Sequence, residues 1–116
     1  MDLHNLTVKN KYYRNVVQTI KKKPGAFQLV LMTLKPKEDI GFEKHPGVTQ
    51  FFYIISGLGQ AIVEDEHFAL GPGISIIVPP GNRHNIINES KTKPLKLFTI
   101  YTSVLHKAGE KNLDKE

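Results

Sequence analysis

The sequence predicts an all-β domain, folded as an antiparallel sandwich or barrel. Short runs of apolar, aromatic and β-branched residues recur along the chain, and residues typical of turns separate them. No convincing helical period extends over three turns before the polar C-terminal segment. A length of 116 residues is typical of one domain. We therefore expect about eight short strands in a single domain.

The first two strands are expected at 12–20 and 27–34. The first run is rich in aromatic and β-branched residues and stops at the basic turn 21–25, which ends in Pro24 and Gly25. The second is strongly apolar and is closed by Pro36.

The remaining strands are separated by clear turn signals. A Gly-rich turn at 56–59 follows one apolar run, and the acidic turn 64–66 joins two others as a hairpin. The rigid bend 79–81, of sequence Pro-Pro-Gly, ends another. These strands are expected at 51–55, 60–63, 67–70, 74–78, 84–87 and 95–103.

The composition limits the class of protein. We expect one domain over 1–116, with 1–11 and 107–116 as flexible termini. There is no cysteine, which excludes disulfides, thiolate ligands and a cysteine nucleophile. No apolar run reaches the ~18 residues of a membrane-spanning helix, and the first residues do not resemble a signal peptide. A cytoplasmic location is therefore the default expectation.

The chain is basic, with a formal net charge of +5 and a sequence pI near 9.5. Its lysines lie mostly at the expected turns, without the exposed aromatic residues that a nucleic-acid-binding face would carry. We expect no nucleic-acid partner and no membrane partner. A small-molecule ligand is the expected partner.

One motif stands out between Gly73 and Asn88. The segment follows the pattern G-x5-P-x-G-x2-H-x3-N, with His84 at the histidine position. His84 begins a strand directly behind the rigid Pro-Pro-Gly bend, which holds it ready to point inward as a ligand or a base.

A second motif, Glu43-x-His45-x4-Gln50-x6-Gly57, lies about forty residues upstream. Glu43 and His45 are two residues apart, so on a strand they project from the same face. Gln50 lies at an odd offset from His45, but the Pro46-Gly47 turn can reset the register. Glu43, His45, Gln50 and His84 are therefore expected to converge on one point.

Together the two motifs resemble those of the cupin superfamily. The upstream motif resembles H-x-H-x3–4-E-x6-G, with Glu43 in place of the first histidine and Gln50 in place of the glutamate. Segments 12–16, 28–32 and 96–101 further resemble small single-domain cupins labelled mannose-6-phosphate isomerase-like. The resemblance implies an antiparallel double-stranded β-helix, the jelly-roll or cupin barrel.

The chemistry of the four side chains fits one divalent metal ion. Two imidazoles, a carboxylate and an amide oxygen are plausible ligands for Fe, Mn, Zn, Ni or Co. Placing the carboxylate at Glu43 and an amide at Gln50 keeps one negative charge among the four ligands. The alternative is a degenerate barrel, in which these side chains bond only to one another and to water.

Four other residues are expected to point into the barrel. Phe52 and Ile54 share the face of Gln50, and Gln28 and Met32 alternate together on their strand. We interpret them as lining the pocket or packing in the core.

Three functional classes follow from this sequence. The first is a metal-dependent enzyme acting on a small sugar-like or enediol-like molecule, as an isomerase, epimerase or oxygenase. The second is a non-catalytic module that binds a small molecule, and the third is a structural barrel with a vestigial site. The edge of the first strand also predicts a homodimer, because pairing with a second subunit would protect it.

Overall fold

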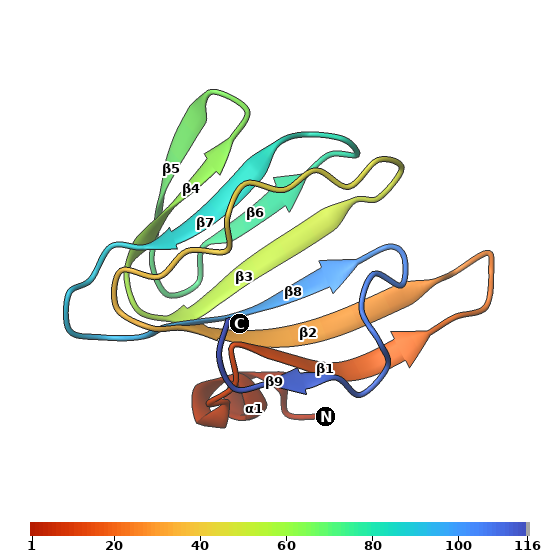
Figure 1. Cartoon of the computed structure of the whole chain (residues 1–116), viewed down its shortest axis with the longest axis horizontal. Coiled ribbons are helices and arrows are strands. Elements are labelled where there is room, and N and C mark those ends of the chain that lie inside the picture. Colours follow the sequence, from red (N-terminus) through yellow and green to blue (C-terminus); the bar gives the residue numbers. More distant parts are fainter. Residues whose placement is uncertain (116) are drawn as a thin grey trace.

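A computed structural model describes residues 1–115 and shows two antiparallel β-sheets that face each other (Figure 1). The larger sheet has six strands in the order β6-β3-β8-β2-β1-β9. In chain order its strands are β1 (Arg14–Ile20), β2 (Phe27–Leu34), β3 (Gln50–Ser56), β6 (Ser75–Val78), β8 (Leu95–Tyr101) and β9 (Lys111–Asn112).

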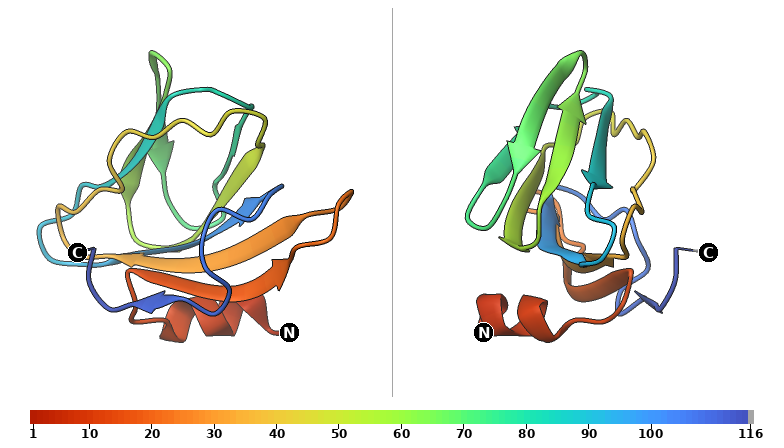
Figure 2. Two further views of the ribbon diagram at one scale, coloured as in Figure 1. Left: turned by 45° about the vertical axis from the view of Figure 1, so that its right-hand side comes forward. Right: turned by 90° about the vertical axis from the view of Figure 1, so that its left-hand side faces the viewer.

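The smaller sheet has the strand order β5-β4-β7. It consists of β4 (Gly59–Val63), β5 (Glu66–Leu70) and β7 (His84–Asn88). Two isolated bridges, Asp39 to Ile87 and Glu43 to His84, pair the segment before β3 with β7 and so extend this sheet. Figure 2 shows the two sheets facing each other across the interior of the barrel.

The alternation of the strands explains this packing. β8 alternates strictly between buried and half-buried residues, as expected for a strand with one face toward a core. Directly opposite residues make the inward rows, for example Val30, Thr99 and Phe52 across β2, β8 and β3. The predicted all-β jelly-roll architecture is confirmed, and the expected strands match the observed ones to within two residues at each end.

Both termini carry structure that the sequence analysis did not predict. Residues expected to be flexible at 1–11 contain α1 (Leu3–Lys9), which begins at the cap Asp2 and packs on the outer side of the larger sheet (Figure 2). Thr7 of this helix is fully buried. Within 107–116, β9 pairs with Arg14 and Asn15 of β1.

The pairing of β9 changes the argument for a homodimer. β1 is not the free edge of the larger sheet, because β9 covers its first two residues. The opposite edge is formed by β6. The homodimer and the cytoplasmic location stay predictions. No helix among residues 1–115 is long and apolar enough to cross a membrane.

Candidate functional site

A row of buried polar side chains lies at one end of the barrel, on the inner face of the larger sheet. Gln28, Tyr101 and Gln50 lie directly opposite one another on β2, β8 and β3. Gln50 is 2% exposed. Its side-chain Nε2 donates to Thr99 Oγ1 at 2.9 Å, which leaves Oε1 as the free end of the amide.

The Glu43–His45 segment is held against β7 by its backbone. Glu43 and His84 exchange two hydrogen bonds, from the Glu43 N–H at 2.9 Å and from the His84 N–H at 3.0 Å. The Pro46-Gly47 turn then returns the chain toward β3, with Gly47 at a φ of 72° that favours glycine. The His45 carbonyl also accepts from the Gly81 N–H at 3.1 Å, which ties the two motifs together.

His84 is 1% exposed and has a fixed orientation. Its Nδ1 lies 3.0 Å from the Asn82 carbonyl oxygen, which can only accept, so Nδ1 carries the proton. The Nε2 atom is therefore a lone-pair donor directed into the barrel. The Phe52 ring packs against the imidazole at a centroid distance of 5.8 Å.

His45 lies beside both Glu43 and His84. Its Nε2 is 3.2 Å from Glu43 Oε2, although this contact does not have hydrogen-bond geometry. The rings of His45 and His84 are 5.4 Å apart between centroids. Burial, with His84 adding to it and Glu43 opposing it, lowers the pKa of His45 below its usual value. At neutral pH its imidazole is therefore neutral and can act as a ligand.

Three buried atoms of the predicted ligands have no hydrogen-bond partner: His45 Nε2, His84 Nε2 and Gln50 Oε1. Tyr101 lies beside two of these residues, because it is directly opposite Gln50 and its ring centroid is 5.7 Å from that of His45. Across residues 1–115, however, no three His, Cys, Asp or Glu side chains are already arranged to hold a metal. To bind an ion between them, the His45 and Glu43 side chains would have to move apart from their present contact.

Sequence reasoning missed two residues at this end of the barrel, Tyr101 and His106. The His106 ring stacks edge-on against Tyr101 at a centroid distance of 5.5 Å, and its Nε2 lies 3.4 Å from the Tyr101 hydroxyl. Burial is the main cause that raises the pKa of Tyr101 well above its usual range, so its hydroxyl stays protonated. Strand alternation could have indicated Tyr101, but His106 follows the last expected strand and carries no such signal.

Gln28 holds the segment that carries His106. Its Nε2 donates to the His106 carbonyl oxygen and to Thr19 Oγ1, and its Oε1 accepts from the N–H groups of Leu105 and His106. The amide of Gln28 thus anchors the chain after β8 to the barrel.

Acid should destabilise the metal-free protein through His106. Burial, and next the charge of Arg14, lower its pKa from the usual 6.5 to about 4. The unfolded chain therefore takes up this proton first as the pH falls, so the stabilisation present above pH 6.5 is lost toward pH 4. We expect the free energy of unfolding to fall by about 1–2 kcal/mol over this pH range. This is less than the full pKa shift would give, because the ring retains contact with water.

Urea unfolding at several pH values checks this prediction. In His106→Gln, the free energy of unfolding should depend less steeply on pH. The remaining dependence comes in part from His45, whose pKa is also lowered and whose protonation therefore also destabilises the fold in acid. His67→Gln is the matched control, because His67 is exposed on β5. An unchanged pH dependence in His106→Gln would contradict the assignment.

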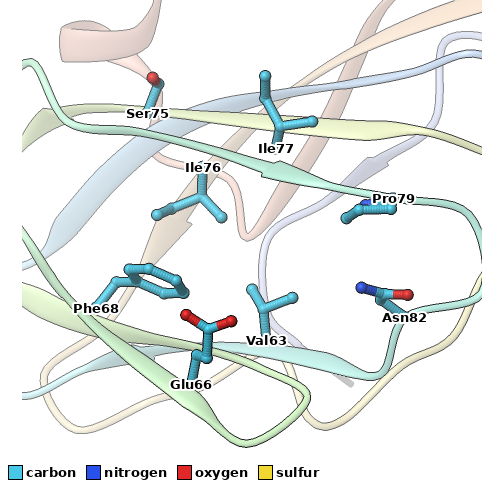
Figure 3. A pocket seen from close by; sticks show the side chains of 8 residues that line it. All are labelled: Val63, Glu66, Phe68, Ser75, Ile76, Ile77, Pro79 and Asn82. Atoms are coloured by element: carbon cyan, nitrogen blue, oxygen red, sulfur yellow. The ribbon is translucent and has the colours of Figure 1, made fainter.

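The residues expected to line a pocket are all buried. Phe52 and Ile54 are fully buried, Met32 is 4% exposed, and all three belong to the hydrophobic core. A cavity of about 400 Å³ lies elsewhere, between β4, β5 and β6 (Figure 3). The eight residues that line it are Val63, Glu66, Phe68, Ser75, Ile76, Ile77, Pro79 and Asn82, which include none of the predicted ligands.

Comparison with known proteins agrees with this fold. Residues 30–101 match the cupin domain. The chain belongs to the cupin family. It is 46% identical over 107 residues to uncharacterized protein L612 of Acanthamoeba polyphaga mimivirus, covering 90% of this chain and 64% of the relative. It is 36% identical over 115 residues to uncharacterized protein YrkC of Bacillus subtilis, covering 94% and 59%. This cupin thus spans about three fifths of the length of these relatives.

Solved structures share the fold. The crystal structure of BH2720 from Bacillus halodurans has a TM-score of 0.91 and 27% identity, over 99% of this cupin and 88% of that chain. A cupin sugar phosphate isomerase from Silicibacter pomeroyi (TM-score 0.61, 20% identity, 67% and 51% covered) shares the fold alone. So does a predicted oxalate decarboxylase from Thermotoga maritima (TM-score 0.62, 16% identity, 84% and 96% covered).

Proposed function

We propose that this cupin binds one divalent metal ion through Glu43, His45, Gln50 and His84, and acts as an enzyme on a small polar molecule. The supporting observation is a set of three buried atoms that make no hydrogen bond within the protein: His84 Nε2, Gln50 Oε1 and His45 Nε2, which lies beside Glu43 Oε2. A buried polar atom without a partner costs about 1–3 kcal/mol. In a barrel with only a structural role, buried water would have to satisfy these three atoms.

The donor set fits a metal ion in its chemistry. Two imidazoles, one carboxylate and one amide oxygen suit Fe, Mn, Zn, Ni or Co, and they place one negative charge beside the ion. When bound, such an ion would supply Lewis-acid or oxygen-binding chemistry. The backbone pairing of Glu43 with His84 and the Asn82 carbonyl would hold the ligands in place.

The other polar groups near the candidate site limit the reaction class. His106, with a pKa of about 4, is a weak base at neutral pH, and Tyr101 stays protonated. Both serve as hydrogen-bond donors better than as proton acceptors. This favours reactions that would rely on the Lewis-acid or oxygen-binding chemistry of a bound ion over an isomerase or epimerase that uses a separate strong base.

Two alternatives remain as proposals: a module that binds a small molecule without turnover, and a barrel with a vestigial site. That this cupin belongs to the mannose-6-phosphate isomerase-like group is likewise a proposal. The test is a screen of metal-loaded protein for oxygen uptake with diols and enols and for isomerisation of sugar phosphates. Turnover that a chelator abolishes supports the enzyme. Metal binding with ligand binding but no turnover supports the module.

Replacing Gln50 by Glu should tighten binding of a hard divalent ion. The variant adds a second negative charge and a stronger oxygen donor at the position of the unpaired amide oxygen, so we expect the dissociation constant to fall by about tenfold or more. Calorimetric titration with Mn²⁺ measures the change. Weaker binding would mean that the Gln50 oxygen does not contact the ion.

A further inference from the structure

The cavity of about 400 Å³ shown in Figure 3 lies between the outermost strands of the two sheets. β5 is the outer strand of the smaller sheet, and β6 is the outer strand of the larger one. Successive side chains of a strand point to opposite faces, yet four of the five residues of β5 are exposed. Neither face of β5 is therefore fully covered by the rest of the domain.

The strand register turns this cavity toward the interior of the barrel. Glu66, Val63 and His84 lie directly opposite one another across β5, β4 and β7. Directly opposite residues share a face of the sheet, and His84 is buried on the inner face, so Glu66 belongs to that face too. Figure 3 shows its carboxylate directed into the space between Phe68 and Val63, with the Ile76 side chain pointing toward them from β6.

The walls of the cavity are mostly apolar. Ile76 belongs to the hydrophobic core, and Val63 is half-buried and packs against that core. The Phe68 ring is 37% exposed, and Pro79 closes the far side. A volume of this size, lined by apolar side chains with a few polar groups, is typical of a site for a small molecule.

Glu66 carries the only formal charge among the eight lining residues. The ion pairs formed within residues 1–115 do not include it. Arg83 follows the lining residue Asn82, but its guanidinium lies over the Phe42 ring, 3.5 Å from the ring centroid. In the part of the chain that the structure describes, the Glu66 carboxylate thus faces an apolar cavity without a cation paired to it.

We propose that this cavity binds a small organic cation, a primary ammonium group attached to a compact apolar or aromatic body. The ammonium group donates charge-assisted hydrogen bonds to Glu66, and the face of the Phe68 ring adds a cation–π contact. The apolar body packs against Val63 and the rest of the aliphatic wall. An anion would be repelled by Glu66, and a neutral ligand would partly desolvate the carboxylate without pairing it. This site is separate from the proposed metal centre and does not need the ion.

The test is an NMR titration of the metal-free full chain with benzylammonium, at neutral pH and constant ionic strength. Benzyl alcohol and benzoate serve as the neutral and anionic analogues of the same shape. We expect a dissociation constant of about 1 mM for benzylammonium, because so small a ligand makes few contacts. Benzyl alcohol should bind several-fold more weakly, and benzoate more weakly still. The largest changes in chemical shift should fall on the residues that line the cavity.

Two variants and a matched control assign the contacts. Glu66→Gln should weaken benzylammonium binding to the level of benzyl alcohol and leave benzyl alcohol binding unchanged. Phe68→Ala should weaken the binding of both ligands. Asp65→Asn is the control, because it removes an acidic charge from the same hairpin turn but does not line the cavity. It should bind benzylammonium as the unchanged protein does.

Several results would overturn the proposal, whatever the metal content of the protein is. Equal affinities for benzylammonium and benzoate would exclude Glu66 as the counter-ion. Equal weakening in Glu66→Gln and Asp65→Asn would mean a diffuse attraction to the acidic turn. No benzylammonium binding well above the expected dissociation constant would reject the site. If that protein also sediments as a dimer that Ile77→Glu separates, a second copy covers the cavity instead, since Ile77 is 64% exposed on β6.

Discussion

Replacing His45 and His84 together by alanine is expected to lower the affinity for a divalent ion by at least about 100-fold. The variant removes both imidazole donors and leaves only a carboxylate and an amide, which bind such ions weakly in water. The effect is measured by titrating Zn²⁺ and Co²⁺ into the chelator-treated protein. Because His84 is buried, its loss should also cost some stability, so circular dichroism must show that the variant is folded.

The chain offers a matched control for this experiment. His4 and His67 are also histidines, but they lie in α1 and on the exposed strand β5, away from the barrel interior. The His4→Ala/His67→Ala variant should bind metal as the unchanged protein does. If the control loses the metal instead, the ion binds elsewhere. If His45→Gln, which keeps the buried His84 in place, retains full affinity, His45 is not a ligand.

Phe52→Ala is expected to destabilise the domain by about 3–5 kcal/mol, the largest stability effect that we predict. Phe52 is fully buried in the core and packs against His84, so its removal leaves a cavity and also loosens a predicted ligand. Urea unfolding followed by circular dichroism measures the loss. Metal affinity should fall as well, because the His84 ring loses its packing partner.

Phe51→Ala is the matched control, since Phe51 is the preceding residue on the opposite face of β3. It lies in an aromatic group on the outer face, with ring centroids 6.4 Å from Tyr53 and 6.3 Å from Phe98. Because Phe51 is only half-buried, we expect a cost of about 1 kcal/mol. Equal costs for the two variants would contradict the inward orientation of Phe52.

Much of the barrel could be predicted because its strands carry their own local signals. The run 27–34 is strongly apolar and is closed by Pro36, and β2 (Phe27–Leu34) occupies the same residues. The placement of His84 behind the Pro-Pro-Gly bend was also readable, since the bend fixes where β7 begins. In both cases a short stretch of sequence determines the structure without help from distant residues.

The elements that escaped prediction depend on long-range contacts. β9 has two residues and exists because it pairs with β1, about a hundred residues earlier. His106 reaches the candidate site because the buried amide of Gln28 binds the backbone around it. The sequence predicted Gln28 as a pocket residue, because the alternation of side chains along a strand places it on the inner face. That alternation does not show which group its amide binds.

The metal content of the purified protein tests the proposed site most directly. The full chain is expressed without added chelator, dialysed against metal-free buffer, and measured by elemental analysis beside the His45→Ala/His84→Ala variant. The proposed ligand set predicts about one divalent ion per chain in the unchanged protein and almost none in the variant. Equal metal contents in the two proteins, or no metal in either one even after incubation with Mn²⁺, Fe²⁺, Co²⁺, Ni²⁺ and Zn²⁺, would contradict it.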